Sequence, residues 1–546
     1  MATTAIERFD YIVIGAGSAG CIVANRLSAD AANRVLLLEA GGEDRNPLFR
    51  LPMLMGKLMH SGLYNWNYRT EPEPNLDGRA IYWPRGKALG GSSTINGMIY
   101  VRGNAHDYDR WAQMGLAGWS YDEVLPLFRR SEGHVDRRDE FHGKDGALTV
   151  CRARGKNPLF DAFVAAGAQA GHAVNDDFNG AAQEGFGRYD FTIRGGKRCS
   201  VARAFLHPVR DRRNLTVRVK ALTSRILVER GRAVGVEYLM GGERRRAAGR
   251  EIVLCAGAVN SPQILMLSGI GDGAALGRHG IESVRHLPGV GRNLHDHVDV
   301  CLVYECRQPV SLYRDLRIDR IAWSVIRGML FGAGIATTFP YEGGAFMKSR
   351  PGLIAPDIQA HFMPALERTA NLRWPRPFRR AAGENNHGFT IRVGPVNPES
   401  RGTVELRSAD PGDPPLIRAN YLATEFDKAT TIAAVRMMRR VVAQPAFDAY
   451  RGRELAPGPE RQADDELREW LKQAGGTTLH PVGTCKMGHD EQAVVDAELR
   501  LRGVAGLRVA DASIMPIICS GNTNAPSIMI GEKAAELILR AARLAA

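Results

Sequence analysis

A glycine-rich turn close to the N-terminus places the strongest constraint on the fold of this chain. Residues 10–14 form a short run of β-branched and aromatic side chains, which is typical of a buried parallel strand. Gly15, Gly17 and Gly20 follow directly with GxGxxG spacing, and a helix is expected over residues 19–27. The first glycine permits a tight turn, the second lets the backbone approach a pyrophosphate, and the third lets the helix pack closely. This pattern predicts a dinucleotide site at the start of an α/β fold.

An acidic residue strengthens this prediction. Residues 35–38 read as the second strand, and Glu39 ends it. Glu39 therefore lies about 20 residues beyond the glycines, where a carboxylate accepts hydrogen bonds from a ribose diol. A 2′-phosphorylated nucleotide is disfavoured because the carboxylate would repel it. The motif by itself does not separate FAD from NAD.

Length and charge narrow the class of protein. A chain of 546 residues is expected to divide into two or more domains. The formal charge is +13, with small basic clusters at residues 244–246, 373–380 and 436–440. A nucleic-acid-binding protein would usually show a basic stripe together with a reading motif, and none is evident. We therefore expect a solvated basic surface and no nucleic-acid partner, with weak attraction to anionic lipid as the alternative.

The pattern of apolar residues bears on the compartment. No signal peptide is evident, and no stretch of about 18 apolar residues predicts a membrane span. The nearest such stretch covers residues 321–339 and is interrupted by Arg327. We expect a buried helix followed by a loop there, or alternatively a surface patch that touches a membrane or a partner. The eight cysteines are scattered without a CxxC pair, which favours reduced thiols and no metal site. A cytoplasmic protein is expected, with peripheral contact to the inner membrane as an alternative.

A second glycine-rich segment has an unusual composition. Gly86, Gly90 and Gly91 precede Ser92 and Ser93, and the segment runs directly into an apolar stretch. Such a backbone can curl around a ligand and present many N–H donors. A flexible linker would be polar throughout, so this segment predicts a binding loop.

The remainder of the chain alternates between two patterns. A buried strand, a glycine turn and a helix recur near residue 250, where Ser261 and Pro262 predict the start of the helix, and again at the C-terminal end. Between them lies a proline-rich region with short strand-like segments at residues 300–306, 357–363, 388–393 and 402–406. This region predicts a second domain, built on an antiparallel sheet and inserted into the first.

Four motifs in order resemble the glucose-methanol-choline (GMC) oxidoreductases over essentially the whole chain. Residues 86–96, GKALGGSSTIN, match the first signature of that family. Residues 257–271, GAVNSPQILMLSGIG, match the second. The segments HPVGTCKMG from His480 and GNTNAP from Gly521 resemble the catalytic end. Within the family, the chain is most similar to the bacterial choline dehydrogenase-like alcohol dehydrogenases.

The resemblance implies a Rossmann-like FAD-binding domain with an inserted α+β substrate domain. We expect the FAD-binding domain to comprise residues 1–155, 196–305 and 462–546, and the substrate domain residues 156–195 and 306–461. The resemblance also implies that FAD contacts Gly15, Gly17, Gly20, Glu39, Gly91, Ser92, Asn96, Gly97, Met98, Thr223, Asp511, Ala512 and Asn524. Some family members tether the flavin covalently through a histidine at the position of Ile95, so non-covalent FAD is expected here.

Alcohol oxidation needs a base for the hydroxyl proton and an acceptor for the hydride. His480 stands between residues that favour a rigid loop, and a neutral histidine suits the base. The family match implies this role for His480. It assigns the second catalytic position to Asn522, ten residues before Glu532. Glu342 and His361 match commonly polar positions of the substrate side, where Glu342 could pair with a cationic substrate.

The resulting hypothesis is FAD-dependent oxidation of a primary alcohol to an aldehyde, with electrons passed to a quinone or another carrier. The first alternative is a choline dehydrogenase. The second is an oxidase that reduces oxygen, and the third is a hydroxynitrile lyase-type enzyme that keeps FAD without redox turnover. The alcohol, the acceptor and the oligomeric state are left open by the sequence.

Overall fold

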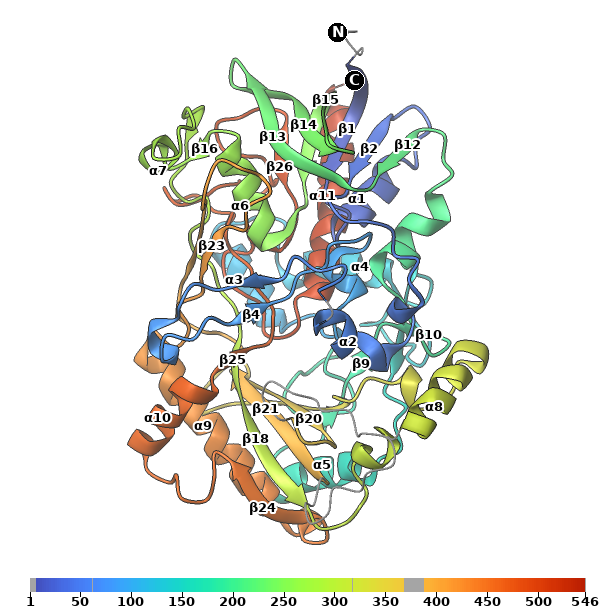
Figure 1. Ribbon diagram of the computed structural model, residues 1–546, viewed down its shortest axis with the longest axis vertical. Helices are drawn as coiled ribbons and strands as arrows, with labels where there is room; N and C mark the ends of the chain where they lie inside the picture. Colours follow the sequence, from blue (N-terminus) through green and yellow to red (C-terminus); the bar gives the residue numbers. More distant parts are fainter. Residues whose placement is uncertain (1–5, 61, 317, 368–386, 546) are drawn as a thin grey trace.

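The computed structural model describes residues 6–60, 62–316, 318–367 and 387–545, and it is built around two large β-sheets. Figure 1 shows one sheet in the upper half of the molecule and the other in the lower half, with helices packed around each. Segments from both ends of the chain contribute to the upper half, and the second sheet is built largely from the middle of the chain. The Rossmann-like fold class expected from the sequence is confirmed.

The first sheet contains the strand predicted at the N-terminus. Its order is β12-β2-β1-β15-β14-β13, and β26 pairs with β15. β1, β2, β12, β15 and β26 are joined in parallel, whereas β13 and β14 form antiparallel pairs at one edge. The strands are β1 (Glu7–Ile14), β2 (Val35–Leu38), β12 (Leu215–Arg218), β13 (Ala221–Glu229), β14 (Arg232–Met240), β15 (Glu243–Leu254) and β26 (Leu507–Val509). β2 is buried throughout, as its continuous apolar run predicts for a parallel strand covered on both faces.

The second sheet is antiparallel, as the middle of the sequence predicts. Its order is β24-β18-β21-β20-β19-β8, and β25 pairs with β18. The strands are β8 (Gly185–Arg188), β18 (Val298–Cys306), β19 (Gly343–Met347), β20 (Ile358–Met363), β21 (Gly388–Pro395), β24 (Arg451–Ala456) and β25 (Gly476–Thr477). The pairing of β25 with the start of β18 is important for the site, because it brings residues 476–477 beside residues 298–299.

The helices cover these sheets with apolar faces. α1 and α11 pack beside each other on the first sheet, and α5 and α9 pack on the second. The helices are α1 (Gly20–Leu27), α2 (Met55–His60), α3 (Ala105–Gln113), α4 (Tyr121–Ser131), α5 (Pro158–Gln169), α6 (Gly257–Leu267), α7 (Gly273–Gly277), α8 (Ile318–Phe331), α9 (Glu425–Val442), α10 (Asp464–Ala474) and α11 (Asn524–Ala545).

Short strand pairs and a small four-stranded sheet complete the structure. They involve β3 (Tyr68–Arg69), β4 (Tyr82–Trp83), β5 (Ile99–Tyr100), β6 (Glu132–His134), β7 (Leu148–Arg152), β9 (Asp190–Phe191), β10 (Ile193–Arg194), β11 (Lys197–Arg198), β16 (Ile270–Gly271), β17 (Arg285–His286), β22 (Thr403–Glu405) and β23 (Leu416–Arg418). The structure therefore consists of two cores with a connecting region between them, although the predicted domain boundaries themselves stay a prediction.

The segment 321–339 differs from the expectation of a buried helix. It forms α8 and the short helix η8 (Ile335–Thr337), and α8 lies at the surface with Trp323, Leu330 and Phe331 exposed. The expectation was wrong because the apolar residues of α8 occupy two faces, of which one packs inward. The alternative, a surface patch, describes the segment correctly. Among the described residues, no helix is long and apolar enough to cross a membrane.

A helix boundary also differs from the sequence-based prediction. α6 begins at Gly257 rather than at Ser261, so Pro262 lies inside the helix. The Asp511 carboxylate accepts hydrogen bonds from the backbone N–H of Gly257 (2.8 Å) and the hydroxyl of Ser261 (2.6 Å), and so satisfies the first turn. A distant side chain therefore sets the start of this helix. The basic cluster at residues 373–380 lies outside the described residues.

Candidate active site

One elongated pocket gathers most of the residues predicted from the sequence. It lies between the glycine turn after β1, the second glycine-rich segment and the loop that carries His480. The lining includes Gly15, Gly17, Glu39, Gly91, Ser92, Asn96, Gly97, Met98, Thr223, His361, His480, Asp511, Ala512, Asn522 and Asn524. Gly20 and Glu342 are the two predicted site residues that do not line it.

The glycine turn has the geometry that its spacing predicts. Gly15 has a φ of +96°, which a residue with a side chain rarely adopts. A Cβ atom at Gly20 would lie 1.9 Å from the Gly15 carbonyl oxygen, so the third glycine serves close packing and not ligand contact. A Cβ atom at Gly17 would meet no protein atom closer than 4.0 Å. The space beside Gly17 therefore belongs to the pocket.

Glu39 is fixed by the backbone around this turn. Its two carboxylate oxygens accept hydrogen bonds from the N–H groups of Ala16 (2.9 Å) and Gly41 (2.7 Å). Burial raises its pKa to about 7, against the lowering effect of these hydrogen bonds. Each oxygen keeps a further lone pair, which suits a ribose diol.

The second glycine-rich segment lies directly against the first. A Cβ atom at Gly91 would come within 2.8 Å of the Gly17 Cα atom, and Gly91 begins the short helix η4 (Gly91–Thr94). Met98 has a φ of +61°, a strained backbone conformation for a residue with a side chain. The Asn96 side-chain oxygen accepts hydrogen bonds from the Met98 N–H (3.1 Å) and the Arg198 guanidinium (2.8 Å), so the Asn96 amide is held in one orientation.

The pocket fits a bound dinucleotide on independent grounds. The Thr223 hydroxyl lines the pocket and is buried without a hydrogen-bond partner, which leaves a polar atom for a ligand to satisfy. A Cβ atom at Gly257 would meet no atom within 4 Å, so the backbone at the start of α6 is open to a ligand. Ile95 lines the pocket at the position of the family's covalent tether and offers no nucleophile, which fits non-covalent FAD.

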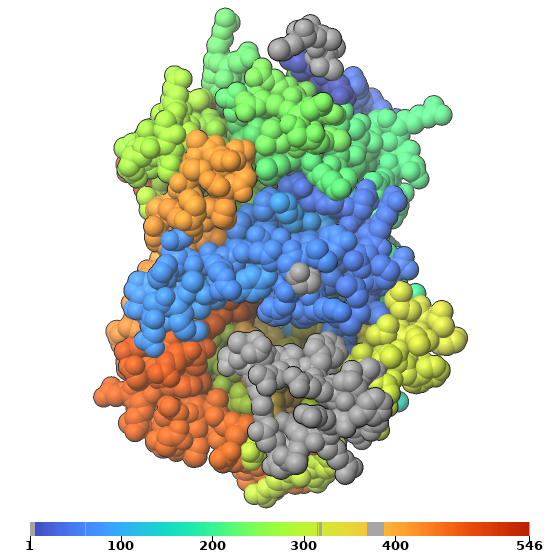
Figure 2. Space-filling view, viewed as in Figure 1, coloured from blue at the N-terminus to red at the C-terminus, as the bar shows by residue number. Residues whose placement is uncertain are grey.

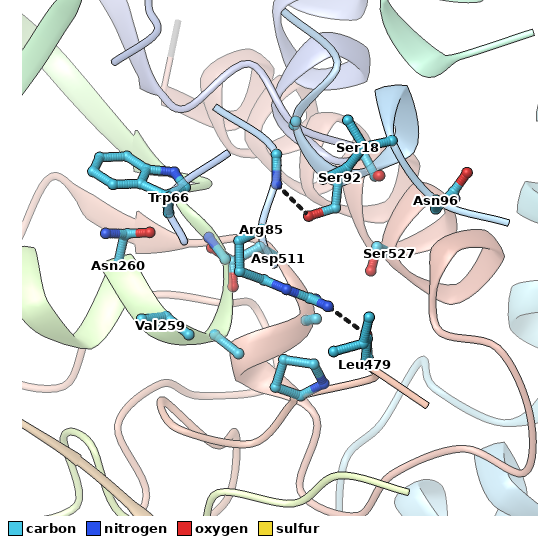
Figure 3. A pocket seen from close by; sticks show the side chains of 18 of the residues that line it. Ser18, Trp66, Arg85, Ser92, Asn96, Val259, Asn260, Leu479, Asp511 and Ser527 are labelled. Atoms are coloured by element: carbon cyan, nitrogen blue, oxygen red, sulfur yellow. Dashed lines mark hydrogen bonds between the residues drawn. The ribbon is translucent and has the colours of Figure 1, made fainter. Parts of the chain in front are cut away.

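Two polar residues that line the pocket, Asp511 and Asn524, are hydrogen-bonded to groups at the starts of helices or in the glycine turn. Asp511 binds the first turn of α6, as described above, and also accepts from the Ser513 N–H at 2.8 Å. The Asn524 side-chain oxygen, at the start of α11, accepts a hydrogen bond from the Ser18 hydroxyl at 2.7 Å. Asn524 thus connects the glycine turn to α11. In Figure 3, Asp511 and Arg85 lie near each other in the centre of the view, and Ser18 and Ser92 lie above them.

The loop before His480 is tightly constrained. Leu479 has a φ of +65°, which is strained for a branched side chain. Its carbonyl accepts a hydrogen bond from Arg85 at 2.8 Å, seen in Figure 3. The Asp296 carboxylate accepts from the His480 N–H at 2.6 Å. These hydrogen bonds hold the loop in its strained conformation and thereby fix the position of His480.

The hydrogen bonds of His297 fix the proton position on His480. His297 Nε2 lies 2.9 Å from the carbonyl oxygen of Val396, so this nitrogen must carry the proton. Burial lowers the pKa of His297 to about 4, so the ring is neutral and its Nδ1 accepts. Nδ1 of His480 lies 3.0 Å from that acceptor and must therefore donate.

The other ring nitrogen of His480 is consequently the basic one. Burial, and then the nearby His297, lower the pKa of His480 well below its usual value, so the ring is neutral and Nε2 carries a lone pair. The Asn522 amide nitrogen lies 3.1 Å from Nε2 and donates to it. Gln359 donates to the Asn522 side-chain oxygen at 3.3 Å, which orients this amide.

The two predicted substrate-side residues separate in the structure. His361 lines the pocket, and burial lowers its pKa to about 3. Glu342 instead binds the Arg188 guanidinium and accepts from the Gly155 N–H at 2.8 Å. The structure therefore places Glu342 outside the pocket, paired with Arg188 of the neighbouring strand β8, and its contact with a substrate stays a prediction.

Sequence reasoning missed several residues of this site. His297 and Asp296 both act on His480, and Arg392 lines the pocket while paired with Asp299 (2.7 Å) and Glu367 (2.8 Å). The sequence feature that could have indicated Asp296 and His297 is the segment His-Asp-His at residues 295–297, directly before the strand predicted at residue 300. Arg392 lies within a predicted strand and carried no such signal.

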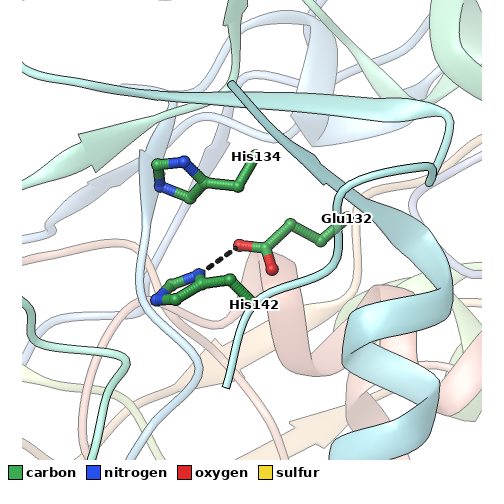
Figure 4. A group of neighbouring side chains, drawn as sticks. All are labelled: Glu132, His134 and His142. Carbon is green, nitrogen blue, oxygen red and sulfur yellow. Dashed lines mark hydrogen bonds and ion pairs between the residues drawn. The ribbon is translucent and has the colours of Figure 1, made fainter. Parts of the chain in front are cut away.

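A separate group of ionisable side chains lies away from the pocket. Glu132, His134 and His142 lie close enough together to suggest a metal site, as Figure 4 shows. However, His134 Nδ1 accepts from two backbone N–H groups, and its Nε2 lies 3.2 Å from Asp190. The two nitrogens of His142 face Glu132 (3.1 Å) and Asp177 (2.9 Å). These contacts occupy the ring nitrogens: His142, Glu132 and Asp177 form an ion-pair network, and His134 is hydrogen-bonded beside it.

Sequence comparison identifies the family. Models described as GMC oxidoreductase match residues 9–299 and residues 398–531. The chain belongs to the GMC oxidoreductase family. It is therefore an FAD-dependent oxidoreductase that acts on CH–OH groups, and the resemblance stated from the motifs is confirmed.

Similar proteins share nearly the full length of this GMC oxidoreductase. It is 46% identical over 533 residues to an oxygen-dependent choline dehydrogenase of Brucella anthropi, which covers 97% of this chain and 95% of the relative. The corresponding protein of Vibrio vulnificus is 44% identical, with 98% and 94% covered.

Solved structures agree with the fold. A pyridoxine 4-oxidase from Mesorbium loti is 32% identical, with a TM-score of 0.88 and coverage of 97% of this chain and 99% of that one. A formate oxidase variant from Aspergillus oryzae, solved to examine FAD modification, is 25% identical with a TM-score of 0.90, and the match covers 99% of this chain and 100% of that one.

Proposed function

We propose that this enzyme oxidises a primary alcohol to an aldehyde, with His480 as the base. The observation that carries the proposal is the lone pair on His480 Nε2, which lies in the pocket beside the Asn522 amide at 3.1 Å. A neutral imidazole can accept the hydroxyl proton at this atom. Asn522 cannot take a proton, so its amide donates a hydrogen bond that orients the substrate oxygen. Bound FAD supplies the hydride acceptor.

Proton movement involves a second histidine in this proposal. His297 holds the proton of His480 on Nδ1, so Nε2 is unprotonated, and the entering alcohol hydroxyl displaces the Asn522 amide from its lone pair. After Nε2 takes the hydroxyl proton, the Nδ1 proton stabilises the resulting imidazolium through its bond to His297. His297 is thus a positioning residue for the base.

Choline is the first alcohol to test. The choline dehydrogenases of Brucella and Vibrio support this choice, since they are 44–46% identical to this chain. Phe339 and Tyr341 line the pocket, and aromatic faces attract quaternary ammonium groups. Against choline, Glu342 is engaged by Arg188. A neutral primary alcohol is therefore the competing substrate class.

The electron acceptor is a separate question. We propose a quinone or a similar carrier, and the alternative is oxygen. The similarity to an oxygen-dependent choline dehydrogenase and to a pyridoxine 4-oxidase favours testing oxygen directly.

A single experiment addresses substrate and acceptor. The FAD-loaded protein is mixed anaerobically with choline and with a series of neutral primary alcohols, and flavin absorbance is followed. Bleaching by choline alone identifies a choline dehydrogenase, whereas bleaching by neutral alcohols alone identifies the competing class. Readmitted air restores the colour within a turnover if the enzyme is an oxidase, and slowly if a quinone is needed. A flavin that no alcohol bleaches would contradict the proposal.

A further inference from the structure

The surface helix α8 carries an apolar face that the fold leaves uncovered. Trp323 is 60% exposed, Ile326 47%, Leu330 70% and Phe331 73%. At about 100° of rotation per residue, these four positions span an arc of about 140°, which is one side of the helix. Four large exposed apolar side chains within three turns of one helix form a patch of the kind that marks an interaction site.

The opposite side of α8 already has its partners. Val325 and Met329 pack against a cluster that contains Leu51 and Leu54. A Cβ atom at Gly328 would lie 3.0 Å from Leu51, which shows how closely the helix approaches this cluster. The fold therefore uses the inner face, and the exposed side chains are not needed to attach the helix.

Basic residues surround the apolar patch. Arg320 and Arg327 are exposed and lie on the same side of α8 as Trp323, by their spacing of three and four residues, and Arg320 also lies 3.6 Å from the Asp315 carboxylate. The β10–β11 hairpin, which bears Arg194 and Lys197, reaches the end of α8. A Cβ atom at Gly196 in its turn would lie 2.4 Å from the carbonyl oxygen of Gly332.

We propose that α8 is a membrane-contact surface, which inserts its apolar face into the headgroup region of an anionic bilayer. Helices that bind at membrane interfaces carry Trp and Phe side chains beside arginines, as α8 does. The formal charge of +13 complements the negative surface potential of anionic lipid. In Figure 1, α8 projects from the edge of the molecule, and Figure 2 shows it, in yellow, on the same margin. A projecting helix suits a deformable lipid surface better than a rigid protein partner, which would need a matching groove.

The position of this surface is also suited to the chemistry. From α8 the chain passes through η8 to Phe339 and Tyr341, both of which line the pocket. A lipid-soluble quinone would therefore approach from the side of the molecule that faces the bilayer. This link to electron transfer rests on the proposed function, whereas membrane binding by α8 does not.

The test is cosedimentation of the FAD-loaded full chain with vesicles. Wild type should bind vesicles of phosphatidylcholine mixed with phosphatidylglycerol, bind pure phosphatidylcholine weakly, and dissociate as salt is raised. The double variant Leu330→Ser/Phe331→Ser should lose at least about tenfold in partitioning, because it removes the two most exposed apolar side chains of the patch. Arg320→Gln with Arg327→Gln should weaken binding to the anionic vesicles by roughly fivefold per arginine.

Leu544→Ser is the matched control. Leu544 is 84% exposed near the C-terminal end of α11, which Figure 1 shows at the top of the molecule, away from α8, and its variant should bind vesicles as wild type does. All variants should show unchanged alcohol-driven flavin bleaching in the absence of vesicles.

Three results would overturn the proposal. In the first, wild type does not bind anionic vesicles at low salt. In the second, the α8 variants bind as well as the control variant. In the third, no vesicle binds, and the protein forms a concentration-dependent dimer that the α8 variant abolishes. The last would make this face a contact between copies of the chain. Failure of flavin bleaching with intact vesicle binding would instead contradict the proposed function alone.

Discussion

At the scale of single residues, the site depends on a chain of hydrogen bonds whose directions can be assigned. The Val396 carbonyl can only accept, so it sets the proton of His297, and His297 in turn sets the proton of His480. The result is a base at His480 Nε2 that faces Asn522. The family motif indicated His480 and Asn522 from the sequence, but the directions of these bonds require the fold.

Replacement of His297 tests whether it positions the base. We expect His297→Phe to lower the limiting rate of flavin bleaching by about 10²-fold, because His480 can then place its proton on Nε2. His297→Gln, whose side-chain oxygen can accept from His480 Nδ1, should recover much of this loss. The alcohol concentration at half-maximal rate should change little in both. Equal rates for Phe and Gln variants would contradict a positioning role.

The pH dependence follows from the lowered pKa of His480. Burial holds this pKa well below 6.5, and the reaction needs the neutral ring. The bleaching rate should therefore be constant above about pH 6.5 and fall only as pH drops through the lowered pKa. Stopped-flow measurements from about pH 5 to pH 9 check this. An acid limb centred above pH 7 would show that His480 is not in the environment described here.

At the scale of structural elements, the sequence correctly predicted the elements whose formation depends on neighbouring residues. The turn after β1 and the helix that follows it, α1, depend on adjacent residues, and the structure agrees with both predictions. The start of α6 was predicted incorrectly because it depends on Asp511, about 250 residues away. The helix α8 was expected, but its burial was predicted incorrectly, because hydropathy alone does not tell which of two apolar faces of a helix is covered.

The glycine turn offers an element-scale prediction. Gly17→Val should yield folded protein with little bound FAD. A Cβ atom at Gly17 meets no protein atom closer than 4.0 Å, so the valine side chain would fit the fold but would occupy the space that FAD needs. The measurement is the ratio of flavin to protein absorbance after purification. Gly277→Ala is the control, since it also meets no atom within 4 Å but lies in α7, away from the pocket. Full flavin content in the Gly17 variant would contradict the assigned site.

The ion-pair network beside β6 predicts a pH-dependent stability. Asp177 and Glu132 raise the pKa of His142 to about 9, against the opposing effect of burial. Since this pKa is above the unfolded value of about 6.5, the contribution is fully present below pH 6.5 and is lost as pH rises through about 9. His142→Gln should therefore lower the melting temperature most near pH 6, and less above pH 9.

The control for this prediction is His279→Gln, at a partly exposed histidine just after α7. It should leave the melting temperature unchanged across the same range. A constant difference between wild type and the His142 variant at all pH values would show that His142 is not held as a cation.

At the scale of the whole molecule, the pocket combines parts from distant segments. The glycine turn follows β1 of the first sheet, His361 lies on β20 of the second, and His480 follows β25. The sequence predicted the two sheets and most of the lining residues, because four family motifs mark them. It could not predict that Glu342 faces Arg188 or that Arg392 reaches the pocket, because both depend on how neighbouring strands align.

The most direct test of the central claim compares wild type with His480→Asn in anaerobic flavin bleaching by the alcohol that the substrate series identifies. We expect normal FAD content in both proteins and a bleaching rate about 10²- to 10⁴-fold lower in the variant. His489→Asn, at an exposed histidine, should behave as wild type. If His480→Asn retains FAD and bleaches at the wild-type rate, His480 is not the base, and the proposed mechanism is wrong.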